Sequence, residues 1–154
     1  MKKAFTMIEL IFVIVILGIL AAVAIPKLNA TRDDAEVVKG ASNFATAISD
    51  IASYYTAKGK FAANILDMTN VPLTPDNKRQ DKAFLYIKNL NCATIIAEGS
   101  EIKIFASPDY QTGVCKKFVD STSVKAIMGN EEFTNHTGIN TAYFIKLGGG
   151  NVSF

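Results

Sequence analysis

Residues 5–25 read FTMIELIFVIVILGILAAVAI, and this stretch decides how the rest of the chain is organised. It is apolar except for Thr6, Glu9 and Gly18. A helix of about 20 such residues is about 30 Å long, which matches the hydrocarbon core of a bilayer. Lys2 and Lys3 precede it, and positive residues favour the cytoplasmic side of a membrane. We therefore expect one membrane-spanning segment, with the rest of the chain exported.

Glu9 is the unusual residue of this stretch. A charged side chain at the centre of a membrane helix costs about 2.5 to 3.5 kcal/mol on insertion scales, and it usually has a partner. No such partner is available inside the stretch itself. Cleavage of the Ala4–Phe5 bond would create one, because Phe5 would then carry an α-ammonium group one helical turn from Glu9. Within one chain or between neighbouring chains, the two charges could neutralise each other in a low-dielectric setting.

The beginning of the chain resembles a known family. A short leader with two lysines, the run FTMIEL, a long apolar segment and Pro26 at its end resemble the N-terminal signal of type IV pilins and type II secretion pseudopilins. The resemblance is close over residues 2–28 and looser over the amphipathic segment that follows. The sequence has Ala4 at a position where this family usually has glycine.

The resemblance implies a processing step and an assembly. A prepilin peptidase would remove the leader, residues 1–4, by cutting between Ala4 and Phe5, and would methylate the new N-terminus. Thr6 and Glu9 would then serve assembly. The precursor would be a single-pass protein of the bacterial inner membrane, with its C-terminal domain in the periplasm. It would join copies of itself and other pilin-like subunits in a pilus or pseudopilus, through an inner-membrane assembly platform.

Two other interpretations of the N-terminal stretch stay open. A generic signal anchor has the same hydropathy. A secretory signal is the other, because Ala22–Val23–Ala24 forms an A-x-A cleavage pattern, and cleavage there would release a soluble periplasmic binding domain that begins at Ile25. Against it, the apolar run exceeds the usual 7 to 15 residues of such a signal, and Glu9 would lie inside it.

The apolar spacing continues beyond Pro26. Steps of four and three residues place one apolar stripe on a helix, formed by Val37, Ala41, Phe44, Ile48, Ile51 and Tyr55. Lys58 and Gly59 are typical of a helix end. We therefore expect one helix from Phe5 to Ala57 with a bend at Pro26. Its first half, 5–25, serves the membrane and assembly, and its second half, 26–57, is amphipathic and packs on a globular head, 58–154.

From Ala83 onward the pattern changes to strands. Residues 61–81 read as a connection with a short helix near Ile65. Short segments rich in β-branched and aromatic residues follow at 84–87, 94–97, 102–105, 114–119 and 141–147, with a four-residue hairpin loop at 98–101 and a short helix or strand at 124–128. We expect an antiparallel sheet of about four strands packed on the amphipathic half of the helix. This is an α+β fold, like that of pilins.

Cys92 and Cys115 both fall in the part expected to be exported. An even number of cysteines in an oxidising compartment favours pairing. A disulfide closing this loop would contribute about 3 kcal/mol in the chain-entropy model. Two buried free thiols are the alternative.

Composition argues against most other functions. The net charge is +2, but from Leu28 onward thirteen basic residues balance thirteen acidic ones, so nucleic acid is not indicated as a partner. His136 is the sole histidine, no Cys/His cluster is present, and no nucleotide-binding glycine loop is found. Glu131 and Glu132 could join Asp109 or Asp120 at a calcium ion, but the spacing is not that of an EF-hand. We expect a structural subunit without metal, cofactor or enzymatic activity; a pilin dedicated to DNA uptake is an alternative.

Overall fold

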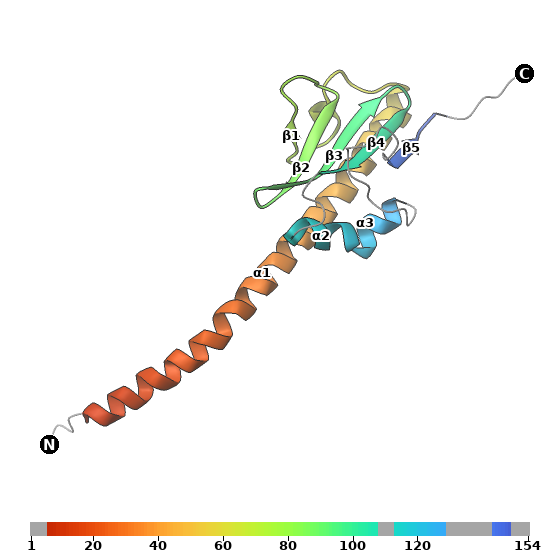
Figure 1. Ribbon diagram of the computed structural model, residues 1–154. Coiled ribbons are helices and arrows are strands. Elements are labelled where there is room, and N and C mark those ends of the chain that lie inside the picture. Colours follow the sequence, from red (N-terminus) through yellow and green to blue (C-terminus); the bar gives the residue numbers. More distant parts are fainter. Residues whose placement is uncertain (1–5, 108–112, 129–142, 149–154) are drawn as a thin grey trace, which may run out of the picture. The chain divides into compact units, whose positions relative to one another are not determined.

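The computed structural model describes residues 6–107, 113–128 and 143–148, except for the side chains of residues 26, 29 and 30. The chain divides into two compact units, Met1–Ala35 and Glu36–Phe154, which we call the N-terminal and C-terminal units. Helix α1 (Met7–Lys58) contributes residues to both (Figure 1). The helix therefore begins two residues later than expected and ends one residue later.

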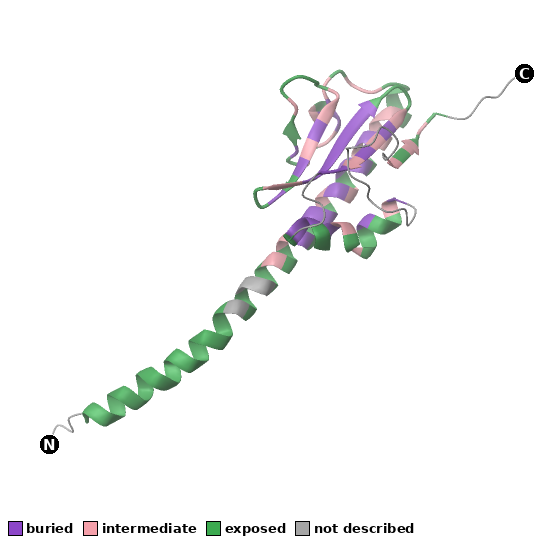
Figure 2. Cartoon of the chain, viewed as in Figure 1, coloured by how far each residue is buried: buried purple, intermediate pink, exposed green. Residues whose placement is uncertain are grey.

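In the N-terminal unit, the described apolar side chains of α1 are exposed. Met7–Ile25 is long and apolar enough to cross a membrane, and none of it is buried (Figure 2). Among its large apolar side chains the exposed fraction runs from 43% for Ile16 to 80% for Met7. The helix continues through Pro26 as expected. The side chain of Pro26 lies outside the described part of the chain, and the bend expected at Pro26 stays a prediction.

In the C-terminal unit, the predicted stripe of α1 faces the core. Five of its six members are buried and Tyr55 is half-buried. Ala47 joins them with no exposed surface, since it lies on the same side of the helix. The helix ends after Lys58, where Gly59 has a φ of 70° and its N–H donates to the carbonyl of Tyr55 at 2.7 Å. A left-handed glycine of this kind is a common helix terminator, as predicted.

A five-stranded antiparallel sheet covers this half of the helix. Its strands follow one another in sequence order: β1 (Thr74–Pro75), β2 (Lys82–Ile87), β3 (Leu90–Glu98), β4 (Glu101–Ala106) and β5 (Tyr143–Lys146). β2 and β4 alternate between buried and less buried residues, because successive side chains point to opposite faces. The fold is α+β, as predicted, and the sheet has five strands where about four were expected. β1 was not among the predicted strands; it has two residues and includes Pro75, and proline is tolerated in sheets at an edge.

The hairpin between β3 and β4 is tighter than predicted. Glu98 and Glu101 pair with each other as the last residues of their strands, so the loop consists of Gly99 and Ser100 alone. Gly99 has a φ of 65°, the left-handed conformation that two-residue hairpin loops require at their first position.

The prediction of a strand at residues 114–119 is wrong. These residues belong to helix α2 (Gly113–Asp120), which is followed by helix α3 (Thr122–Ile127), and the short helix near Ile65 is the 3-10 helix η1 (Ile65–Met68). Val114, Cys115 and Phe118 are buried whereas Lys116 and Lys117 are exposed. Spacings of three and four residues give one buried side of a helix, and they do not alternate as a half-buried strand requires.

Two contacts hold α2 and β2 against α1. The rings of Phe44 and Phe118 meet edge to face with centroids 5.6 Å apart, which places α2 against α1. Gly40 lets α1 approach β2 closely, because a Cβ atom there would lie 2.7 Å from Cγ1 of Ile87. Phe44, Phe118 and Ile87 are all buried, so both contacts belong to the core.

Candidate assembly site at the start of helix α1

Thr6 and Glu9 are joined by reciprocal hydrogen bonds at the start of α1. The Thr6 N–H donates to Glu9 Oε2 at 2.8 Å, and the Thr6 hydroxyl donates to the same oxygen at 2.7 Å. In return the Glu9 N–H donates to Thr6 Oγ1 at 3.4 Å. This is a capping box, in which a threonine before the helix and a glutamate three residues later satisfy each other's backbone N–H groups. It explains why the helix begins at Met7.

The capping box gives the Glu9 carboxylate partners within its own chain. They are neutral donors, and the N-terminal end of a helix also favours a negative charge. The prediction that no partner for Glu9 is available inside this segment is therefore wrong, because Thr6 donates both hydrogen bonds. The signal was present in the sequence, because Thr6 and Glu9 have the T-x-x-E spacing of a capping box.

The surface around Glu9 is apolar. Ile8, Phe12 and Val13 line an open hollow of about 340 Å³ together with Glu9. Phe12 is 67% exposed. Soluble monomers rarely expose contiguous apolar surface of this extent, so the first half of α1 requires lipid or other helices around it. Ala4 and Phe5 lie outside the described residues, and the pairing of a Phe5 ammonium with Glu9 stays a prediction.

Residues 1–25 match the family model described as the prokaryotic N-terminal methylation motif. This segment is the prepilin-type signal carried by type IV pilins and pseudopilins, as predicted from the run FTMIEL. No curated protein and no solved structure matches the chain. The signal and the apolar helix that follows it support a pilin-like precursor in general terms and fit anchoring in the inner membrane. The motif implies pilin-like subunits and a prepilin peptidase as partners in general terms.

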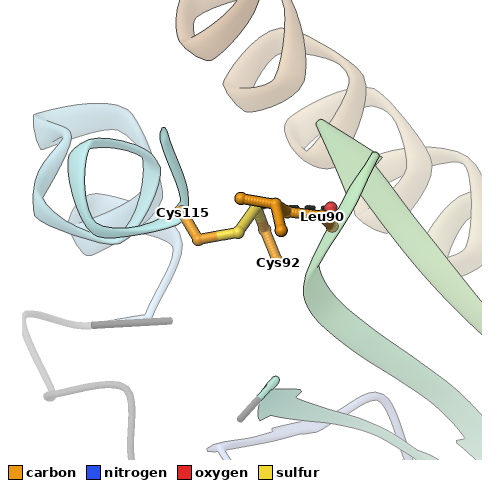
Figure 3. The surroundings of a disulfide bond; sticks show 3 residues. All are labelled: Leu90, Cys92 and Cys115. Atoms are coloured by element: carbon orange, nitrogen blue, oxygen red, sulfur yellow. Dashed lines mark hydrogen bonds between the residues drawn. A yellow bond between two sulfur atoms is a disulfide. The ribbon is translucent and has the colours of Figure 1, made fainter. Parts of the chain in front are cut away.

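The two cysteines form a disulfide in the C-terminal unit (Figure 3). Cys92 comes from β3 and Cys115 from α2, with their Cα atoms 5.0 Å apart and both side chains fully buried. The pairing is as predicted, but the element that carries Cys115 is a helix. Leu85 pairs with Ala93 and Tyr86 with Asn91, so Cys92 is the extra residue of a β-bulge. Bulges re-aim side chains, and this one leaves Cys92 free to reach α2.

A group of ion pairs gathers where β1 leads into β2. Lys82 Nζ lies 3.0 Å from Asp76, and Arg79 pairs with Asp81 through two hydrogen bonds. The Arg79 guanidinium holds the pKa of the Asp81 carboxyl below its usual value. Such pairs near the surface contribute little to stability individually. They are consistent with a structural role for this loop.

Candidate metal ligands are not brought together in the part of the chain that the structure describes, where no group of three or more His, Cys, Asp or Glu side chains could hold a metal ion. Asp109, Glu131 and Glu132, which the sequence suggested for calcium binding, lie outside the described residues, as does the sole histidine, His136. Asp120 is described, and it pairs with Lys116 and Lys125.

Proposed function

We propose that this protein is a structural subunit of a type IV pilus-like or type II secretion filament. A prepilin peptidase cleaves the precursor between Ala4 and Phe5, and the mature subunit assembles through α1. The observation that supports this most is the methylation motif at residues 1–25, whose apolar part forms a helix with its side chains exposed. The role is structural, without cofactor or catalysis.

The physical basis of assembly is exchange of one apolar environment for another. In the membrane, lipid would surround Met7–Ile25, which is long and apolar enough to span a bilayer. In the filament, the same segment packs against its copies, and Gly18, Ala21 and Ala22 allow close approach of the helices. A subunit can leave the bilayer because helix contacts replace lipid contacts.

In this exchange, Glu9 favours the docked helices of the filament over the isolated helix in the membrane. Its carboxylate is tolerated near the end of an apolar helix because Thr6 donates two hydrogen bonds to it. Once Phe5 becomes the N-terminus, its ammonium group offers an opposite charge. An ion pair in an apolar surrounding is stronger than in water, so pairing between subunits favours docked over isolated helices, whereas pairing within one subunit only neutralises Glu9.

The N-terminus of the mature protein tests the proposal. Protein isolated from its host should begin at a methylated Phe5, as determined by intact mass and N-terminal sequencing. A protein that begins at Ile25 would instead be a released periplasmic domain. An intact Met1 on working filaments would contradict processing. Secretion, DNA uptake and motility or adhesion are distinguished by deleting the gene and measuring each activity.

A further inference from the structure

The C-terminal unit has a pocket between helix α1 and the hairpin that joins β2 to β3, which we call the hairpin pocket. Its volume is about 250 Å³. The lining residues come from one stretch of α1, from the loop before β1 and from the hairpin: Glu36, Lys39, Gly40, Asn43, Pro72, Tyr86, Ile87 and Lys88. All of them belong to the C-terminal unit and to the described residues, so the chemistry of the pocket can be stated group by group.

The buried part of the hairpin pocket is formed by Gly40 and Ile87. A Cβ atom on Gly40 would lie 2.7 Å from Cγ1 of Ile87, so helix and strand are in direct contact there. Lys88 and Asn89 form the two-residue loop of the hairpin, and Lys88 has the positive φ, 56°, that such loops require. The pocket therefore lies on packed elements joined by a tight turn, and ligand sites are usually pre-formed in this way.

The hairpin pocket contains polar side chains that have no partner in their own chain. Within the described residues, no hydrogen bond or ion pair reaches the side chains of Glu36, Lys39, Asn43 and Tyr86. Glu36 and Lys39 are three residues apart on α1, where side chains are neighbours, and yet they do not pair. Lys88, in contrast, already has an interaction within the chain. Neither sign of charge dominates among the groups that are left for a ligand.

These groups differ in the hydrogen bonds that they make. The carboxylate of Glu36 can only accept them, and the ammonium of Lys39 can only donate them. The Asn43 amide and the Tyr86 hydroxyl do both. A simple anion would meet Glu36 and a simple cation would meet Lys39, so like charges oppose either ligand. A ligand with many hydroxyl groups satisfies the whole set, because each hydroxyl both donates and accepts.

Tyr86 and Pro72 give the hairpin pocket an apolar side. Both residues are exposed, and Tyr86 is 46% exposed. An aromatic ring beside polar groups suits a ligand that has an apolar face and a polar rim, as a sugar ring has. A zwitterion such as an amino acid would depend on its two charges instead. Lys39 is exposed, and ion pairs at exposed positions contribute little.

We propose that the hairpin pocket binds one ring of a neutral saccharide. Glu36 accepts a hydrogen bond from one hydroxyl, Lys39 and Asn43 donate to others, and the Tyr86 ring lies against the C–H face of the sugar. The volume is slightly below the range of about 300 to 1,000 Å³ that is usual for drug-sized ligands, which suits a single sugar ring. This function goes beyond the proposed filament role and does not depend on it, because one chain supplies every lining residue.

Saturation-transfer NMR on the full-length protein tests the proposal. The protein is kept in a polyoxyethylene detergent, because maltoside detergents would themselves present sugar rings. The probes are glucose, galactose, mannose and N-acetylglucosamine, each added alone. Glycine and acetate serve as the zwitterionic and the anionic comparison. We expect saturation transfer from the protein to at least one of the sugars and none to glycine or acetate.

Substitutions then locate the site. Tyr86→Ala and Asn43→Ala should each weaken the binding of the responding sugar about tenfold, since each removes a direct contact. The matched controls are Phe144→Ala, which removes an aromatic ring that is 47% exposed, and Asn77→Ala in an exposed loop. Both should bind the sugar like the wild type.

Lys39→Ala keeps the test valid if the other pocket variants unfold. Lys39 is an exposed helical residue outside the core, so its replacement should leave the fold intact and weaken sugar binding severalfold. Near-ultraviolet circular dichroism checks the fold of each variant.

Three results would overturn the proposal. They are the absence of saturation transfer to all four sugars, transfer that the folded pocket variants leave unchanged, and a stronger response to glycine or acetate than to any sugar. None of them bears on the filament role, because binding is measured on unassembled protein and the filament role is tested by the mature N-terminus.

Discussion

Gly40 of α1 lies against Ile87 of β2, so closely that a Cβ atom on Gly40 would stand 2.7 Å from Ile87 Cγ1. Ile87 is 2% exposed and β-branched, so its side chain has little freedom to move away. A helical glycine usually costs stability, by about 1 kcal/mol relative to alanine. At Gly40 this loss of stability comes together with close packing of α1 on the sheet.

Gly40→Val should therefore destabilise the C-terminal unit. We expect a loss of about 1 to 3 kcal/mol, the usual cost of overpacking a core. Thermal unfolding of the full chain in detergent, followed by near-ultraviolet circular dichroism, measures it. The double variant with Ile87→Ala should lose less than the sum of the single variants, because the smaller side chain makes room. Additive losses would argue against the contact.

Substitution of Glu9 should separate membrane insertion from assembly. Glu9→Ala should insert normally and should abolish or weaken filament formation. Glu9→Gln can still close the capping box but has no charge, so it should also fail if pairing with the Phe5 ammonium drives docking. Membrane fractionation and the yield of sheared filaments provide the measurements. Normal filament yield from Glu9→Gln would show that the capping box suffices.

Thr6 should matter through its hydroxyl. Thr6→Val keeps the shape of the side chain but removes the group that donates to Glu9 Oε2, and loss of a cap costs about 1 kcal/mol. We expect a lower filament yield, measured as for Glu9. Thr6→Ser retains the hydroxyl and should assemble like the wild type. Equal yields from the valine and serine variants would contradict a role for the cap.

Removal of the disulfide should destabilise the C-terminal unit. The cysteines are 23 residues apart, and a loop of this size corresponds to about 3 kcal/mol in the chain-entropy model. The Cys92→Ala/Cys115→Ala variant should unfold at lower temperature than the oxidised wild type. Reductant should lower the wild-type midpoint and leave that of the variant unchanged. A wild-type midpoint insensitive to reductant under unfolding conditions would contradict the contribution.

Acid should weaken the region around Asp81. Arg79 lowers the pKa of this carboxyl in the folded state, so the pair stabilises the fold above the unfolded value of about 3.9. The contribution is lost as the pH falls through the lower, folded pKa. Asp81→Asn should therefore show a smaller loss of stability between neutral pH and pH values below about 4 than the wild type. Urea unfolding at a series of pH values measures the difference.

The sequence of the N-terminal segment was sufficient to predict that it forms a long apolar helix. The run from Met7 to Ile25 is apolar except for Glu9 and Gly18, so its helix and its need for an apolar surrounding follow from local composition alone. The stripe from Val37 to Ile51 was predictable for a related reason, because helical periodicity is a local property. The T-x-x-E spacing of Thr6 and Glu9 carried equally local information about the cap.

Tertiary structure decided what depends on contacts distant in sequence. Val114 to Val119 has strong β-forming residues, yet it is helical because the buried side formed by Val114, Cys115 and Phe118 packs on α1 and β3. The bulge at Cys92 depends on the register between β2 and β3. The groove lined by Asp50, Tyr54 and Asp67 exists only because η1 lies beside α1. Local propensity is weak compared with burial of a whole apolar face, so the sequence determined the N-terminal helix and the tertiary contacts determined the C-terminal unit's surfaces.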